Sequence, residues 1–359
     1  VIPNKNEIIF SQEYIQKCVD KWSAFFDIDF GGLNRSPKFP MPTNYQFLMR
    51  HAYKTQNSNL QAYVNTTLTK MAYGGIFDQI GGGFARYSVD EKWHIPHFEK
   101  MLYDNGQLVS LYSDAYLIYK NELYKETVYN TLKFIERDLM HENGGFYASL
   151  DADSLNEQEE LEEGAFYVWK KEELEKIIGA DFDLFAQYYN INEYGFWEND
   201  SYNLIRSTSD QAFANLHTIA IADFKNTVDK WKNKLLTERA KRQPPRLDDK
   251  ILTSWNALML KGYVDAYRVF NDDHFLDVAL KNASFLEENI INKDGRLFRN
   301  YKNKKATINA YLEDYATLIE AYISLYEVSL NDKWILLAKK LTDYTFEHFY
   351  DKDSNMFFF

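Results

Sequence analysis

Histidines and carboxylates that could transfer protons are concentrated in residues 74–105, GGIFDQIGGGFARYSVDEKWHIPHFEKMLYDN. The glycines of this segment permit a tight loop, and its proline suits the first position of a helix. The sequence therefore predicts that His97, Glu99 and Asp104 lie in the opening turns of a helix, close to His94. Carboxyl and imidazole groups act as general acids and bases when their surroundings adjust their pKa values. These four residues are candidate catalytic groups.

Two acidic pairs stand at the starts of other predicted helices. Asp248 and Asp249 precede one helix, which Asp249 is expected to cap, and Glu313 and Asp314 occupy the first turn of another. Helix N-termini present unpaired N–H groups and a partial positive charge, so starts that face a common centre form a ligand site. Asp249 and Asp314 therefore join the candidate catalytic residues. Capping alone also explains an acid at such a position.

A fourth acidic cluster covers residues 151–163, where seven of thirteen residues are Asp or Glu. A run of this kind is usually a hydrated loop. An EF-hand is excluded because Leu155 and Asn156 occupy its fifth and sixth positions. Asp151 and Asp153 are kept as candidate ligand-binding residues.

Metal and phosphate sites are not expected. His94, His97 and Glu99 lack the spacing of any defined zinc motif. The three glycines at 81–83 are not followed by Gly-Lys-Ser/Thr, so they indicate a turn and not a phosphate loop. The sequence predicts no bound metal and no cofactor.

Aromatic residues accompany the acidic clusters, and a pocket that combines carboxylates with aromatic faces suits sugars. The predicted ligand is therefore a small sugar-like molecule. The other candidate ligand-binding residues are Lys38, Phe39, Asp78, Arg86, Tyr87, Asp248, Trp255, Asn256 and Glu313.

Amphipathic helices must position these residues. The segments 124–139, 275–290 and 334–349 share one apolar spacing, which buries a single face, and each is followed by a turn-forming residue. The segments 251–270 and 311–328 are apolar on nearly every face. Two concentric layers are expected, with one-sided helices outside and apolar helices inside. A solenoid of stacked hairpins is the alternative.

The predicted helices form outer and inner pairs, and loops at 74–96 and 141–163 cover one mouth of the ring. The last outer helix has no inner partner in the chain. The pairs lie near 11–26 and 43–55, 58–72 and 97–119, 124–140 and an irregular region at 165–190, 224–241 and 250–270, 274–291 and 310–329, and 332–349 alone.

Composition limits the class of protein. The 359 residues carry a net charge of -12, which opposes binding to nucleic acid and to anionic membranes. No apolar run approaches the roughly 20 residues that cross a bilayer, and the single cysteine, Cys18, cannot form an intramolecular disulfide. A soluble, cytoplasmic protein without nucleic-acid or membrane partners is expected. The chain does not begin with Met, and we expect a fragment of a longer protein.

Several long motifs carry a resemblance to a known family. They are the run at 74–105 with RSPKFPMP, GGFYASLDADS, EGAFYVW, LDDKILTSWNALM and YLEDYA. Together they resemble the thioredoxin-domain-containing family that includes the spermatogenesis-associated protein. The resemblance implies an all-α (α/α)6 toroid with short β-hairpin loops, similar to six-hairpin glycosidases and N-acylglucosamine 2-epimerases. It also implies that residues 1–359 are a single toroid domain without the family's preceding thioredoxin-like domain, a partner in the full-length protein, and without a C-terminal segment.

Two classes of function follow. The first is a carbohydrate-active enzyme, either an epimerase, which needs a base on each face of one carbon, or a glycoside hydrolase, which needs a pair of carboxyl groups. The second is a non-catalytic module that holds a ligand or supports the thioredoxin-like domain. A working acid or base has a shifted pKa in a cleft, whereas a capping carboxylate bonds to backbone N–H groups.

Overall fold

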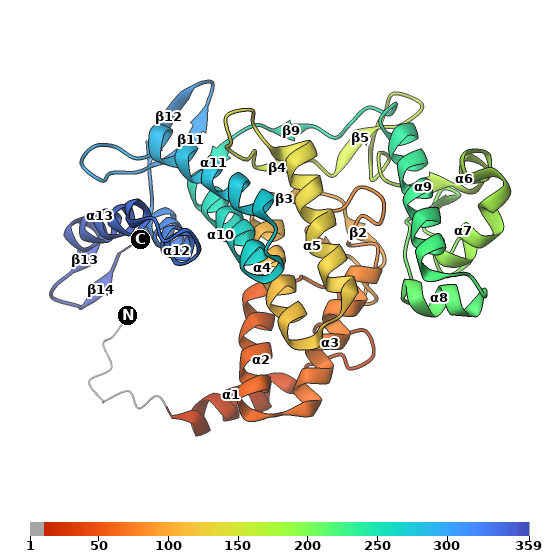
Figure 1. The fold of residues 1–359 in the computed structure, drawn as a ribbon, viewed down its shortest axis with the longest axis horizontal. Coiled ribbons are helices and arrows are strands. Elements are labelled where there is room, and N and C mark those ends of the chain that lie inside the picture. The colour runs from red at the N-terminus through yellow and green to blue at the C-terminus, as the bar shows by residue number, and fades with distance from the viewer. Residues whose placement is uncertain (1–10, 359) are drawn as a thin grey trace.

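A computed structural model describes residues 11–358, and helices make up most of it (Figure 1). The helices are α1 Gln12–Ser23, α2 Pro42–Thr55, α3 Ser58–Tyr73, α4 Leu102–Tyr119, α5 Glu122–Phe134 with a π-helical turn Ile135–Leu139, α6 Lys171–Ile178, α7 Phe182–Tyr188, α8 Asp210–Leu216, α9 Ile221–Arg239, α10 Thr253–Phe270, α11 Asp273–Asn289, α12 Leu312–Ser329 and α13 Asp332–His348.

The strands are short and form antiparallel pairs or three-stranded sheets in the orders β1-β2, β3-β4-β9, β5-β6, β7-β8, β10-β11-β12 and β13-β14. Their bounds are β1 Tyr87–Ser88, β2 Pro96–His97, β3 Lys100–Met101, β4 Ser149–Leu150, β5 Asp153–Leu155, β6 Leu161–Glu163, β7 Trp169–Lys170, β8 Ser201–Tyr202, β9 Leu247–Asp248, β10 Ile251–Leu252, β11 Phe298–Lys302, β12 Lys305–Asn309, β13 Tyr350–Asp351 and β14 Met356–Phe357.

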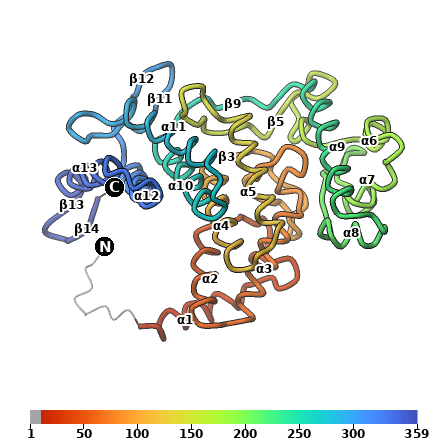
Figure 2. The backbone as a smooth tube through the Cα atoms, viewed as in Figure 1, coloured from red at the N-terminus to blue at the C-terminus, as the bar shows by residue number. Residues whose placement is uncertain are grey.

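Helices α2, α4, α10 and α12 pack side by side in that order, and each also packs on the helix that follows it, α3, α5, α11 and α13. Figure 2 shows the resulting curved, two-layered path of the backbone. Among α2, α4, α10 and α12, helix α4 has buried residues on nearly every face. Among the helices that follow them, α13 buries a single stripe, which consists of Trp334, Ala338, Leu341 and Thr345. The predicted inner and outer layers are confirmed.

One type of turn joins each inner helix to its outer partner. The residue after the inner helix has a left-handed backbone conformation, and the next residue is an Asn or Asp whose side chain caps the outer helix. Such a cap accepts a hydrogen bond from an otherwise unpaired N–H group. The four pairs are Gln56-Asn57, Lys120-Asn121, Asn271-Asp272 and Leu330-Asn331.

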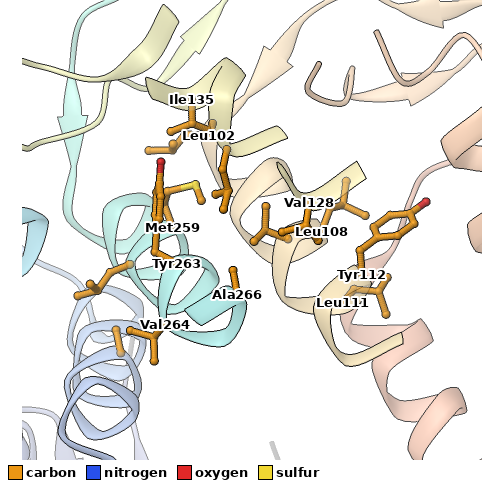
Figure 3. Packing of buried hydrophobic residues seen from close by; sticks show 14 of the residues in the cluster. Leu102, Leu108, Leu111, Tyr112, Val128, Ile135, Met259, Tyr263, Val264 and Ala266 are labelled. Carbon is orange, nitrogen blue, oxygen red and sulfur yellow. The ribbon is translucent and has the colours of Figure 1, made fainter. Parts of the chain in front are cut away.

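Glycines bring α4 and α10 close together. A Cβ atom on Gly106 would lie 2.9 Å from the Cα of Met259, and one on Gly262 would lie 2.7 Å from the carbonyl oxygen of Gly106. Only residues without a side chain fit so close an approach. Figure 3 shows Leu102 of α4 and Tyr263 of α10 in the surrounding core.

Paired asparagines fix the starts of these two helices. Asn105 accepts a hydrogen bond from the Phe84 N–H at 2.7 Å and donates to the Phe84 carbonyl at 3.0 Å. Asn256 makes the same two bonds with Phe146, at 2.8 and 2.9 Å. Each asparagine is the fourth residue of its helix and is fully buried. The preceding loop is thereby held against the helix start.

Residues 165–241 do not contribute to the two layers, which corrects the sequence prediction. α6, α7, α8 and α9 pack around a separate hydrophobic cluster that includes Trp169, Phe185 and Trp231, and they lie together at the right of Figure 1. The irregular region at 165–190 is therefore not an inner helix, and the segment 224–241 is not the outer partner of α10. Apolar periodicity gives the buried face of a helix but not the core that covers it.

Two helix starts were also misplaced. The helix expected from residue 97 begins at Leu102, because Pro96 and His97 pair with Tyr87 and Ser88, and Lys100 and Met101 pair with β4. Asp249 does not cap α10, whose N-cap residue is Leu252. In the part of the chain that the structure describes, no helix is both long and apolar enough to span a membrane.

Candidate functional site

The N-terminal ends of α4 and α10 lie beside the sheet β3-β4-β9. Met101, Ser149 and Asp248 are partners across its three strands. Glu99 directly precedes β3 and Asp151 directly follows β4, and these two strands pair antiparallel, so both acids lie at the edge of the sheet that contains Asp248. Three of the predicted site residues are thereby gathered at one mouth of the fold.

A connected set of polar side chains lies at the start of α4, and we call it the mouth cluster. Its members are Arg86, His97, Glu99, Tyr103, Asp104 and Glu163. The Arg86 guanidinium donates to Glu99 Oε2 at 3.0 Å, and Glu99 Oε2 lies 3.8 Å from His97 Nε2. The backbone N–H of Arg86 donates to the Glu99 carbonyl at 2.9 Å, so the two residues are fixed by main chain as well as by charge.

His97 is oriented by a carboxylate. Its Nδ1 lies 2.7 Å from Glu163 Oε1. Because a carboxylate only accepts, Nδ1 carries a proton and Nε2 is the atom that faces Glu99. The backbone N–H of Phe98 donates to the same Glu163 oxygen at 3.3 Å. This arrangement presents one imidazole nitrogen to the mouth in a defined direction.

Asp104 is a buried carboxyl group of the cluster. Burial raises the pKa of its carboxyl to about 7; Tyr103 and Arg86 oppose this rise and Glu99 adds to it. Its Oδ2 atom is buried and has no hydrogen-bond partner among residues 11–358. Burial in a medium of low polarity favours the neutral form of a carboxyl group. Asp104 therefore exchanges a proton near neutral pH.

Aromatic rings border the mouth cluster on two sides. Tyr87 stacks on the His97 ring with 4.9 Å between centroids, and Phe39 contacts Tyr87 at 4.9 Å. On the α10 side, Tyr103 contacts Trp255 at 4.9 Å. Phe39 is 45% exposed, so one ring at this border is open to solvent. Carboxylates between aromatic faces form a surface that fits the polar edges and apolar faces of a sugar.

Asp314 and Glu313 lie elsewhere and have structural partners. Asp314 is fully buried; its Oδ1 accepts from the Ser254 N–H at 3.0 Å and its Oδ2 from the Tyr311 N–H at 3.0 Å. Arg299 donates to Asp314 at 3.1 Å and to Glu313 at 2.6 Å. These are the contacts of a helix cap.

The acidic candidates at 151–153 and at 248–249 are ion-paired or exposed. Asp249 pairs with Lys302 at 2.5 Å, Asp248 with Lys250 at 3.0 Å and Asp151 with Arg246 at 3.1 Å. Asp153 is exposed on β5. Asn256 is occupied by the loop contacts described above.

Lys38 and Asp78 are buried in ion pairs. Lys38 donates to Asp27 at 2.6 Å and to the Gly31 carbonyl at 2.7 Å. Asp78 binds Lys100 and Arg239, which holds its pKa far below the usual range in spite of burial. Both residues connect loops to the rest of the fold.

His94 does not join His97. Its Nε2 lies 3.3 Å from the Gly195 carbonyl, and its ring stacks on Tyr194. Burial lowers the pKa of His94, against the effect of Asp90. In the described part of the chain, no group of three or more His, Cys, Asp or Glu residues is placed to hold a metal ion.

Two members of the mouth cluster were not selected from the sequence. Glu163 ends the acidic run that indicated a hydrated loop, and Tyr103 was one aromatic residue among many. The signal for Glu163 in the sequence was the glycine that follows it. In the structure Gly164 has φ +77°, and a Cβ atom added to it would lie 2.5 Å from the Phe98 ring. A glycine so constrained indicates that the backbone beside Glu163 packs closely on the segment that carries His97.

Solved structures with a similar fold include glycoside hydrolases. The chain aligns with a family 76 glycoside hydrolase from a Bacteroides thetaiotaomicron strain at a TM-score of 0.56 and 9% identity, over 97% of this chain and 58% of that one. A family 105 glycoside hydrolase of C. acetobutylicum aligns at 0.55 and 10%, over 96% and 74%. The chain therefore has the six-hairpin (α/α)6 toroid fold, as the sequence predicted.

Comparison with known sequences identifies homologues of this chain. The chain is 32% identical to human spermatogenesis-associated protein 20 in an alignment 375 positions long, gaps included, which covers 95% of this chain and 48% of that protein. It is 34% identical to an uncharacterized protein of Caenorhabditis elegans in an alignment of 371 positions, which covers 94% of this chain and 50% of the relative. The resemblance drawn from the motifs is confirmed: the chain is a homologue of the spermatogenesis-associated protein 20 sequences.

The chain spans about half the length of these relatives. No protein-family profile matches it.

Proposed function

We propose that the mouth cluster is a carbohydrate-acting acid–base site and that its reaction is glycoside hydrolysis. One observation carries the proposal: a buried carboxyl group with a pKa of about 7, Asp104, lies close enough to feel the charge of Arg86, and Arg86 itself donates to a second carboxylate, Glu99. Glycosidases use two carboxyl groups whose environments assign them different protonation states.

The roles follow from the contacts. Asp104, protonated near neutral pH, donates its proton to the leaving glycosidic oxygen. Glu99, ion-paired with Arg86, accepts a proton from the water that attacks the anomeric carbon. His97, directed at Glu99 by Glu163, relays that proton to solvent. Phe39 and Trp255 bind the sugar faces on either side.

The fold shared with glycoside hydrolases supports a sugar substrate by analogy. The predicted central pocket is part of the proposal: the sugar would lie over the mouth cluster, between α4 and α10. Asp249, Asp314 and His94 are not given a catalytic role in it, because each has a structural partner.

Epimerisation is the second candidate, and the orientation of His97 favours it. An imidazole and a neighbouring carboxyl group of pKa about 7 can serve as two acid–base groups on opposite faces of one carbon. This reaction exchanges a carbon-bound hydrogen with solvent and breaks no glycosidic bond.

One experiment separates the possibilities. The purified chain is incubated in D2O with a panel of mono- and oligosaccharides, and products are followed by mass spectrometry and by the release of reducing ends. New reducing ends support hydrolysis, and deuterium in an intact sugar supports epimerisation. Neither product, together with no thermal shift by any sugar, would favour a non-catalytic module.

The matched variants are Asp104→Asn and Asp114→Asn. Both residues lie on α4, both carboxyl groups have a pKa raised by burial, and both substitutions keep the side-chain shape. Asp114 lies ten residues, or about 15 Å, farther along the helix and pairs with Arg50. Only Asp104→Asn should abolish turnover. Equal loss in both variants would contradict a catalytic role for Asp104.

A further inference from the structure

A small cavity borders the side chain of Lys100, the residue that follows Glu99 of the mouth cluster. The cavity has a volume of about 20 Å³ and is bordered by Asp78, Lys100, Tyr167 and Arg239, with further residues of the 74–85 loop and of 203–204. A volume of this size accommodates a single water-sized particle.

The charges that border the cavity do not balance. Lys100, Arg239 and Asp78 have side chains that are 3%, 5% and 7% exposed. With Lys100 protonated, two cations and one carboxylate leave one positive charge; burial, with Arg239 nearby, lowers the pKa of Lys100, which is the direction that an excess of positive charge produces. The neighbouring ion pair between Arg137 and Asp138, at 2.6 Å, is neutral by itself. An uncompensated buried charge is unfavourable because it has lost its hydration.

Asp78 has no capacity left to balance a second cation. Its Oδ1 accepts from the backbone N–H groups of Ile80 and Gly81 and from Arg239, and its Oδ2 accepts from Lys100 and Arg239. Each carboxylate oxygen has about two lone-pair positions. Asp78 is therefore fully engaged.

Two hydrogen-bond donors at the cavity are unused. The Tyr167 hydroxyl and the Nε–H of Arg239 are buried and have no partner among the described residues. Tyr167 is 6% exposed and Arg239 4% exposed. Lys100 Nζ lies over the Tyr167 ring, 4.7 Å from its centroid, so the two residues are in direct contact. A buried O–H or N–H donor without an acceptor is costly.

We propose that this cavity binds a monovalent anion of about the size of chloride. Such an ion accepts hydrogen bonds from the Tyr167 hydroxyl and the Arg239 Nε–H and neutralises the excess positive charge. It joins the two-layered part of the fold, through Lys100, to the segment that contains α6 to α9, through Tyr167 and Arg239. It also supports from below the strand that leads from Glu99 to Asp104.

Thermal unfolding in matched salts tests the proposal. The protein is melted in increasing sodium chloride, with sodium methanesulfonate added to keep the ionic strength constant. A bound anion raises the Tm by mass action, and the rise saturates. Bromide should act as chloride does, and a crystal grown in bromide should show an anomalous peak between Tyr167 and Arg239.

Two tyrosine variants provide the specificity control. Tyr167→Phe removes one proposed donor, so the chloride-specific rise in Tm should fall several-fold. Tyr189→Phe also removes a buried hydroxyl without a partner among the described residues, but one that lies in the α6 to α9 core, and it should leave the chloride effect unchanged. Equal melting in both salts with no bromide peak would show that water occupies the cavity, and a chloride effect that survives Tyr167→Phe would place the ion elsewhere. Either result overturns the proposal.

Discussion

The carboxylate of Asp314, on α12, accepts a hydrogen bond of 3.0 Å from the backbone N–H of Ser254, on α10. One acid thus caps the first turn of a neighbouring helix while its second oxygen caps its own helix through the Tyr311 N–H. Because Asp314 is fully buried, this contact fixes the relative height of the two inner helices.

Asp314→Ala should destabilise the protein by about 2–4 kcal/mol, since it removes two caps and leaves Arg299 without its buried partner. Glu313→Ala is the control: Glu313 binds the same Arg299 but is 44% exposed, so its loss should cost about 0–1 kcal/mol. Urea unfolding of both variants measures the difference. Equal costs would show that the cap contributes little.

Asn105→Ala should cost about 2–4 kcal/mol, because it leaves the buried backbone groups of Phe84 without partners. Gln107, two residues later, makes one bond to the Tyr103 carbonyl and is only partly buried. Gln107→Ala should therefore cost less than about 1 kcal/mol. Amide hydrogen exchange adds a local test, because the Phe84 N–H should lose protection only in Asn105→Ala.

Asp104→Asn should stabilise the protein above pH 7. The folded-state pKa of about 7 exceeds the ordinary aspartate pKa of 3.8 that holds in the unfolded chain, so the native state binds more protons between these values and loses stability as the pH rises through them. The variant lacks this penalty, which is on the order of 2–4 kcal/mol at pH 8. The Tm difference should approach zero near pH 4. A variant less stable than the native chain at pH 8 would contradict a burial-raised pKa.

Glu163→Gln should lower the turnover of any sugar substrate at least about tenfold, because the His97 ring loses the carboxylate that orients it. The carboxylate is 43% exposed, so stability should change little. Glu162→Gln is the control, since Glu162 contacts Asn156 and not His97. If both variants retain full activity on a substrate that Asp104→Asn no longer converts, His97 has no part in the reaction.

Helix periodicity in the sequence predicted most of the two layers. The expected 58–72 and 332–349 are α3 Ser58–Tyr73 and α13 Asp332–His348, because each buries a continuous apolar stripe. The start at residue 97 was wrong because short strands there pair with segments up to about fifty residues away along the chain. The core of α6 to α9 was missed since local spacing carries no information on which segments share a core.

The site was harder to predict for a chemical reason. A capping acid and a catalytic acid occupy the same kind of position, the first turn of a helix, so Asp314 and Asp104 look alike in sequence. They differ in the hydrogen bonds that their carboxyl groups accept. Asp314 accepts hydrogen bonds from two backbone N–H groups, whereas Asp104 has one oxygen without a partner among the described residues. Only long-range packing distinguishes them.

The adjacency of β4 and β9 has a consequence for how this protein can vary. Ser149 pairs with Asp248, so the chain leaves the sheet and returns to it on neighbouring strands, which lie about 4.8 Å apart. Everything between them, including α6 to α9, is an insertion whose two ends already meet. Its length and content can change through evolution or by grafting without displacing α5 or α10, provided that its contacts with the rest of the fold are replaced at the same time, among them that of Arg239 with Asp78 and that of Glu163 with His97.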